Sequence, residues 1–215
     1  NALDANTTGY KNMAFGGHAL SANTTGNYNT AIGHQSLSAN TSGHENIAIG
    51  YQTANYNQTA SYNIAIGNDA LGNNKTGTRN IAIGHDALNG QLQFDESDNL
   101  AIGYDALGGG LYDGEKNVAI GNYSLDANTS GDYNVAVGYN ALTGNTTGAN
   151  NTAFGYKAGD VITTGTNNVL LGYSADPSAV DGANQIVIGK DATGQGDNYA
   201  VIGNADVTRL YAAQD

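Results

Sequence analysis

The chain has 215 residues, enough for one or two globular domains, but only 12% of them are Asp, Glu, Lys or Arg, about half the usual share. A formal net charge of −12 disfavours phosphate backbones and anionic membrane surfaces, so we expect no nucleic-acid partner. The absence of cysteine excludes disulfides, thiolate metal sites and cysteine nucleophiles. No apolar run is long enough to insert in a membrane, and the start at Asn1 predicts a segment of a longer chain.

One five-residue phrase, Asn-x-Ala-Ile-Gly with close variants, recurs along the chain. Its ten copies begin at Asn12, Asn29, Asn46, Asn63, Asn80, Asn99, Asn117, Asn134, Asn151 and Asn168. The interval is 17 residues, except that it is 19 after Asn80 and 18 after Asn99. Two weaker copies, at 185–189 and 199–203, follow after 17 and 14 residues, so the turns weaken and shorten over 185–215. We therefore predict a single repeat solenoid over 1–215.

Each unit presents the same elements in the same order. The phrase, as at 46–50, is short, rich in β-branched residues and closed by Gly, which predicts a strand. An Ala-Leu or Ser-Leu pair follows, and then a turn such as 40–43, which ends in a glycine able to adopt positive φ. Stacked units would pair each strand with its copies in parallel, which predicts an all-β parallel solenoid without helices.

Stacking turns each position of the unit into a column along the rod. The most regular column comprises Asn29, Asn46, Asn63, Asn80, Asn99, Asn117, Asn134 and Asn151, with Asn12 and Asn168 at its ends. An amide can donate to one neighbour and accept from the other. This column therefore predicts a structural hydrogen-bonded ladder.

Both faces of the repeated strand are apolar. Because side chains alternate, Ile47 and Ile49 point to one face and Ala48 to the other. The sequence leaves open which face is inward, but the second face needs a cover, and identical chains about a symmetry axis would supply it. We therefore predict an obligate homotrimer, and expect Asp at either Ala65 or Ile66 to disrupt the rod.

The repeated phrases resemble those of a known family. Asn-Ile-Ala-Ile-Gly at 46–50, 63–67 and 80–84, with its variants at 134–138 and 151–155, resembles repeats of the YadA-like head of trimeric autotransporter adhesins. The longer period and the Asn-Thr-Thr-Gly turns are closer to repeat tracts in phage tail fibres, upstream of their intramolecular chaperone domain, and 201–211 is similar to the junction there.

The resemblance implies a left-handed parallel β-roll of about twelve 17-residue turns per chain, with three chains about one axis. It implies a place outside the cell, on a bacterial or virion surface, and leaves open which of the two. Near 209–215 it also implies an exit from the roll and a processing site.

Catalytic chemistry is weakly represented in the sequence. The four histidines are His18, His34, His44 and His85, and His34 and His85 share a column three turns apart, roughly 14 Å at strand spacing. No nucleophile elbow, phosphate-binding loop or metal-binding His-Glu-x-x-His motif is present. We predict that the chain is not an enzyme and carries no cofactor.

A weak metal candidate is a column of carboxylates. Asp69, Asp86 and Asp105 each stand two residues after the strand Gly in consecutive units, with neighbours near 5 Å. Calcium would relieve their repulsion, but water and side-chain splay would do so as well.

Two sets of residues are candidates for receptor binding. Tyr139, Tyr156 and Tyr173 follow the strand Gly on successive turns, as do Tyr51 and Tyr104 elsewhere, and would either stack on sugars or stabilise the rod by stacking together. The two longer units supply Phe94, Asp95, Glu96, Asp98, Tyr112, Asp113 and Glu115. Insertions in a solenoid occur at outward turns, so we expect these two loops to lie side by side as a binding surface.

These patterns predict a fibrous adhesin or tail-fibre segment that attaches to a cell-surface glycan or protein. The alternative is a purely structural shaft whose binding tip lies elsewhere. An ice-binding solenoid is a third class, but its Thr and Ser column is interrupted; the column contains Thr25, Ser42, Thr59, Thr76, Ser130, Thr147 and Thr164.

Overall fold

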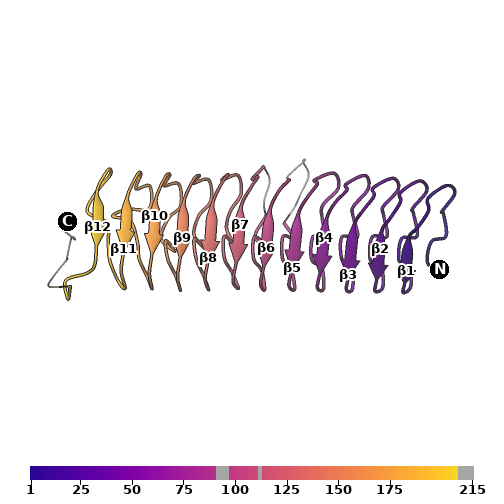
Figure 1. Ribbon diagram of the computed structural model, residues 1–215, viewed down its shortest axis with the longest axis horizontal. Coiled ribbons are helices and arrows are strands. Elements are labelled where there is room, and N and C mark those ends of the chain that lie inside the picture. The colour runs from indigo at the N-terminus through magenta and orange to yellow at the C-terminus, as the bar shows by residue number, and fades with distance from the viewer. Residues whose placement is uncertain (91–96, 111–112, 208–215) are drawn as a thin grey trace, which may run out of the picture.

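The structure is a computed structural model that describes residues 1–90, 97–110 and 113–207. Twelve strands of three residues recur once per unit (Figure 1). They are β1 (Met13–Phe15), β2 (Thr30–Ile32), β3 (Ile47–Ile49), β4 (Ile64–Ile66), β5 (Ile81–Ile83), β6 (Leu100–Ile102), β7 (Val118–Ile120), β8 (Val135–Val137), β9 (Thr152–Phe154), β10 (Val169–Leu171), β11 (Ile186–Ile188) and β12 (Ala200–Ile202). The strand prediction is confirmed. Over the described ranges there is no helix, and so none that could cross a membrane.

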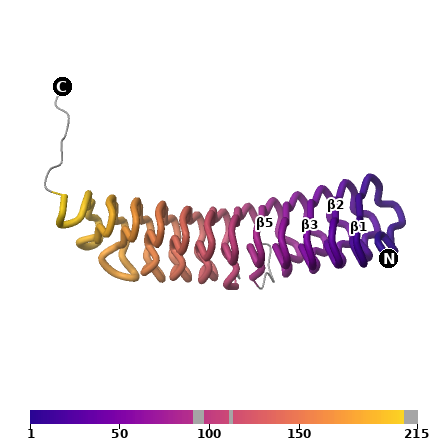
Figure 2. The backbone as a smooth tube through the Cα atoms, turned by 90° about the horizontal axis from the view of Figure 1, so that it is seen from below, coloured from indigo at the N-terminus to yellow at the C-terminus, as the bar shows by residue number. Residues whose placement is uncertain are grey.

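All twelve strands form one sheet in chain order, each parallel to its neighbours. The register follows the repeat, since Ile47 pairs with Ile64 and Ile64 with Ile81. The longer units keep this register, and the shortened last turn pairs Ile186 with Ala200. The chain thus winds through about eleven turns, against the predicted twelve, into a rod with the described ends, residues 1 and 207, far apart (Figure 2), which confirms the parallel solenoid.

A glycine follows each strand because the chain turns there in a conformation that other residues rarely adopt. From Gly16 to Gly189 these glycines have φ between 129° and 143°. A Cβ on Gly84 would also collide with the carbonyl group of Gly103 in the next turn. Glycine is therefore required both by its own dihedral angle and by the close approach of the next turn.

The glycine of the Asn-x-x-Gly turn has a different role from the glycine that follows each strand. Gly43 does not use the positive φ that glycine can adopt in a turn. A Cβ on Gly43 would collide with the carbonyl oxygen of Ala60 and with Oδ1 of Asn40, so close approach alone requires glycine. The left-handed residue is instead Glu45, with φ of 57°.

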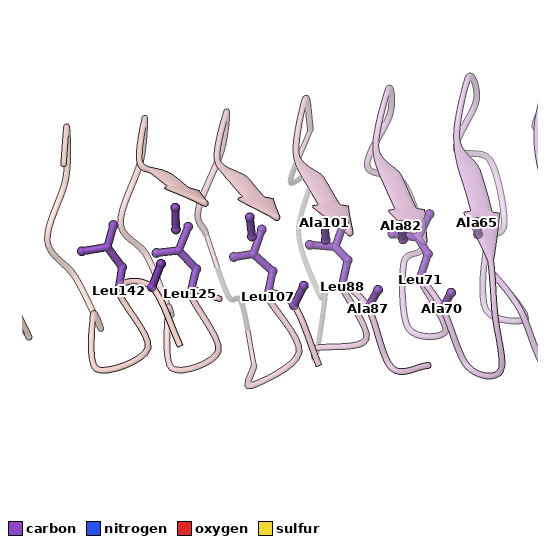
Figure 3. Close-up of a cluster of buried hydrophobic side chains, with 14 of the residues drawn as sticks. Ala65, Ala70, Leu71, Ala82, Ala87, Leu88, Ala101, Leu107, Leu125 and Leu142 are labelled. Atoms are coloured by element: carbon purple, nitrogen blue, oxygen red, sulfur yellow. The ribbon is translucent and has the colours of Figure 1, made fainter. Parts of the chain in front are cut away.

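The inward face of the sheet carries the alanines. Ala48, Ala65 and Ala82 are fully buried, and so are their equivalents in β2 and in β6 to β9. Opposite them a column of leucines fills the interior, as Figure 3 shows for Leu71, Leu88 and their copies. A typical turn buries the strand alanine, a second alanine and a leucine, as with Ala82, Ala87 and Leu88, so a larger strand residue fits only where the leucine is replaced by a smaller residue.

The buried leucines adopt a left-handed backbone conformation that the sequence does not predict. Leu71, Leu88 and Leu107 have φ of 54°, 49° and 51°, in the left-handed region. This costs about 1–2 kcal/mol per residue. Full burial of the side chain contributes about 2–3 kcal/mol, and the Leu88 amide donates to the carbonyl oxygen of Ala106 in the next turn at 2.9 Å. Burial and stacking therefore hold each leucine in place.

In one part of the core, a larger strand residue compensates for a missing leucine in the neighbouring turn. Gly159 stands where other units carry leucine, and Leu170 stands where other strands carry alanine. A Cβ on Gly159 would lie 2.6 Å from Cδ1 of Leu170, and Ile162 is also fully buried beside it. The larger strand residue thus fills the space that the missing leucine leaves.

The predicted asparagine ladder forms, and all eight of its residues are at most 1% exposed. The predicted amide-to-amide bond forms at some steps, as from Asn46 Nδ2 to Asn29 Oδ1 at 3.1 Å, but the bond common to every step is a different one. Each side-chain Oδ1 accepts from the backbone amide of the next asparagine, as Asn63 does from Asn80 at 2.8 Å. The side-chain Nδ2 of Asn63 donates to the carbonyl oxygen of Gly77 at 2.9 Å. The ladder therefore ties the start of each strand to the turn of the following unit.

A second asparagine column lies in the Asn-x-x-Gly turns and was not anticipated. Asn40 Nδ2 donates to Gly43 O at 3.0 Å and to Asn23 Oδ1 at 2.8 Å. Asn145 Nδ2 donates to Gly148 O at 3.0 Å and to Asn128 Oδ1 at 3.1 Å. The Asn in Asn-Thr-Thr-Gly is thus a buried element of the rod as well as a turn residue.

Candidate functional site

The outward face of the sheet is apolar along the described rod, apart from Thr30 and Thr152. In each strand the first and third residues are the outward ones, whereas the residue between them, mostly alanine, is fully buried in β2 to β11. The third residues make an unbroken apolar column: Phe15, Ile32, Ile49, Ile66, Ile83, Ile102, Ile120, Val137, Phe154, Leu171, Ile188 and Ile202. Their exposure reaches 75% at Phe15 and 56% at Phe154. The structure thus decides which strand face is inward, and leaves the isoleucine face uncovered in a single chain.

The tyrosines that follow the strand glycine stack on one another. Tyr139, Tyr156 and Tyr173 form two stacked pairs, with ring centroids 5.5 and 5.0 Å apart and planes within 12°. Each ring remains 43–49% exposed. Since neighbouring rings occupy both faces of Tyr156, it cannot stack on a sugar. Tyr156 presents its edge and hydroxyl group instead, whereas Tyr173 ends the stack with one ring neighbour.

The stack includes rings that the sequence analysis left out. His85 stacks on Tyr104 at 5.2 Å, and Tyr123 contacts Tyr104 and Tyr139 at 5.4 and 5.8 Å. Six rings therefore contact in succession from His85 to Tyr173. A separate short stack joins His18, His34 and Tyr51, at 6.0 and 5.6 Å. In the sequence, each of these rings stands one or two residues after the repeated glycine, and this spacing could have identified them.

A second column of aromatic rings lies near the starts of the strands, at residues one or two positions before the asparagine ladder. Tyr10 contacts Tyr28 at 5.4 Å, and the Lys116 ammonium lies 5.2 Å from the centroid of the Tyr133 ring. A groove of about 560 Å³ is lined by Tyr28, Thr30, Glu45 and Ile47, where this column meets the apolar face.

The predicted binding loops lie partly outside the described residues, which applies to Phe94, Asp95, Glu96 and Tyr112. Asp98 is engaged within the chain, because Arg79 Nε and Nη2 donate to its two carboxylate oxygens at 2.6 and 2.8 Å. This pairing lowers the pKa of Asp98. Glu115 accepts from Lys116 at 2.9 Å, and only Asp113 is exposed without such a partner. Asp98 and Glu115 are thus ion-pair partners within the rod.

The predicted carboxylate column is held by protein groups. Asp86 contacts His85 Nδ1 at 2.8 Å and accepts from Asn89 Nδ2 at 2.8 Å. Asp69 accepts from Asn68 Nδ2 at 2.8 Å. Burial, and then the charge of Asp86, raise the pKa of Asp69 and of Asp105. Within 1–90, 97–110 and 113–207 no three acidic or histidine side chains lie close enough together to bind a metal ion.

Asp176 is the most perturbed acid near the C-terminal end. Burial, and then the charge of Asp160, raise its pKa from 3.8 to about 6, and its Oδ1 is buried without a hydrogen-bond partner. Because the folded state favours the protonated acid, this contribution to stability is full below pH 3.8 and is lost as the pH rises through about 6.

Asp176→Asn should therefore stabilise the rod at pH 7.5 by about 1 kcal/mol, after allowance for solvent screening of a half-exposed group. Urea unfolding of both proteins at pH 5 and pH 7.5 measures this, and the gain should shrink at pH 5. An equal effect at both pH values would contradict the assignment.

Comparison with known protein families, with curated proteins and with solved structures finds no match for this chain. Its function therefore has to be inferred from its own surfaces.

Proposed function

We propose that this chain is a non-enzymatic, cofactor-free segment of a homotrimeric fibre that attaches to a cell surface, in the manner of adhesin heads or tail fibres. The observation that carries the proposal is the apolar outward face of the sheet. Three-fold symmetry, left-handed winding and an extracellular location follow from the resemblance of the repeated phrases.

The apolar face needs a cover of unusual length and regularity. Eleven steps at strand spacing make a strip roughly 50 Å long, and a monomer rarely exposes a contiguous apolar patch of more than a few hundred Å². Its side chains repeat once per turn, from Phe15 to Ile202. Another copy of the same solenoid has this same period, so identical chains can cover one another in register along the whole strip.

Attachment would then depend on several identical, weak binding sites that act together. Three chains repeat every surface feature three times about the axis, and linked weak sites gain affinity through effective concentration. The net charge of −12 favours a glycan or protein on the target cell over a nucleic acid. The exposed ring edges and Asp113 are the described groups that face outward for such a partner.

A purely structural shaft is the second candidate. The continuous ring stack and the intrachain pairing of Asp98 and Glu115 favour it, because both use groups that an adhesin would leave free. Glycan-array binding by the isolated 215-residue chain supports attachment. Binding that appears only with a longer chain supports the shaft.

Light scattering tests the assembly. We expect a mass near three times 22.0 kDa for the natural chain. Ile66→Asp places a carboxylate on the outward face, at a position 36% exposed in one chain, and should reduce the mass to that of a monomer with an intact strand signal in circular dichroism. A natural chain that is monomeric, or an Ile66→Asp variant that remains trimeric, would contradict the proposed interface.

A further inference from the structure

We propose that the interruption of the ring stack at Asn68 is a slot for one neutral pyranose ring of a glycan. This inference rests on the proposed attachment function and names the class of its ligand. The slot is walled by Tyr51 on one side and His85 on the other, which lie two turns apart with Asn68 on the turn between them.

The height of the slot follows from the stack itself. Rings on adjacent turns elsewhere on this edge have centroids 5.0–6.0 Å apart. Tyr51 and His85 are separated by two such steps, so one ring layer is missing between them. Tyr51 stacks on His34 and His85 on Tyr104, which leaves one face of each wall turned toward the slot. A flat ring placed there would sit at stacking distance from both walls.

On this turn a small amide, Asn68, stands where the neighbouring turns on either side carry the rings of Tyr51 and His85. Asn68 Nδ2 donates to Asp69 Oδ2 at 2.8 Å, which binds the small amide to its own turn. The His85 wall is oriented by the 2.8 Å contact of its Nδ1 with Asp86. Both walls remain accessible, with Tyr51 51% exposed and the His85 side chain 46% exposed.

The chemistry of the slot favours a neutral sugar. The C–H face of a pyranose packs on aromatic rings, and Asp69, beside Asn68 on the same turn, offers a carboxylate to hydroxyl groups. Both oxygens of Asp86 are engaged by Asn89 and His85, so Asp86 contributes negative charge only. The same carboxylates and the net charge of −12 repel uronic and sialic acids. The structure therefore assigns a preference for neutral over acidic sugars, which the ring edges of the continuous stack would not provide.

Saturation-transfer NMR with methyl β-D-glucopyranoside and methyl β-D-galactopyranoside on the 215-residue protein tests the slot. For ligands of this size we expect at least one of the two to bind with a dissociation constant of about 1 mM. The methyl glucuronide should bind at least about ten-fold more weakly, because of charge repulsion. Tyr51→Ala and His85→Ala should each weaken binding about five-fold.

Asn68→Tyr is the decisive variant, because the new ring fills the slot and joins the two stacks. It should abolish glycoside binding and raise the melting temperature. Lys190→Tyr is the matched control, since Lys190 follows Tyr173 at the end of the stack; there the new ring extends the stack without entering the slot, and binding should remain.

Several results would overturn the slot: no binding of either neutral glycoside at 20 mM, binding that survives Asn68→Tyr, or phenol binding more tightly than the glycosides, which would indicate an aromatic side chain as the ligand. Light scattering on the same samples separates the two proposals. A trimer without glycoside binding removes the slot alone, and a monomer that binds the glycoside removes the assembly alone.

Discussion

Ala65→Asp should prevent the rod from folding. Ala65 is fully buried on the inward face of β4, within a core cluster of alanine and leucine side chains that offer a new carboxylate no partner. An uncompensated buried charge costs at least about 3–5 kcal/mol, against a total stability of about 5–15 kcal/mol for a domain. Circular dichroism should show loss of the strand signal, and the protein should accumulate in the insoluble fraction.

Ile66→Asp, one residue further along the same strand, is the control for this experiment. Ile66 points outward, so the single-chain roll should remain folded even though its assembly is lost. The sequence predicts disruption of the rod by either substitution; the structure separates the two into a folding defect and an assembly defect. Folded Ala65→Asp protein would contradict the assignment of the inward face.

Gly84→Ala should destabilise the rod by about 3 kcal/mol or more, through two effects. The φ of 139° is strained for any residue with a Cβ, and that Cβ would also collide with the carbonyl group of Gly103. The midpoint of urea unfolding measures the loss.

Gly196→Ala separates the two effects. Gly196 has φ of 142°, but a Cβ there meets only ring atoms of Tyr199, at 3.6 and 3.7 Å, which is ordinary contact. This variant should lose only the conformational part, about 1–2 kcal/mol. Equal losses in the two variants would show that the close approach of adjacent turns is not what requires glycine after each strand.

The ion pair between Arg79 and Asp98 could have been predicted from the sequence. Arg79 and Asp98 both precede an asparagine of the ladder, so they occupy one column in adjacent turns and meet in a bidentate ion pair. The side-chain bonds of the second asparagine column could have been foreseen by the same reasoning.

The extent of the ring stack required the backbone conformation. Tyr123 stands two residues after its glycine, whereas Tyr104 and Tyr139 stand one residue after theirs. All three nevertheless contact in one column, and Tyr123 has φ of 59°. A left-handed residue redirects its side chain, so sequence position alone does not decide which edge a ring joins.

The repeat by itself determined the strands, their parallel order, their register and the asparagine ladder, because a pattern that recurs every 17 residues allows one stacking in which every copy meets its equivalent. Only the tertiary structure decided which strand face is inward. Alternation makes both faces apolar, and the choice depends on the leucines across the narrow interior, which leave room for alanine and not for isoleucine. Packing volume, which the spacing of residues does not encode, thus placed the isoleucine face on the outside.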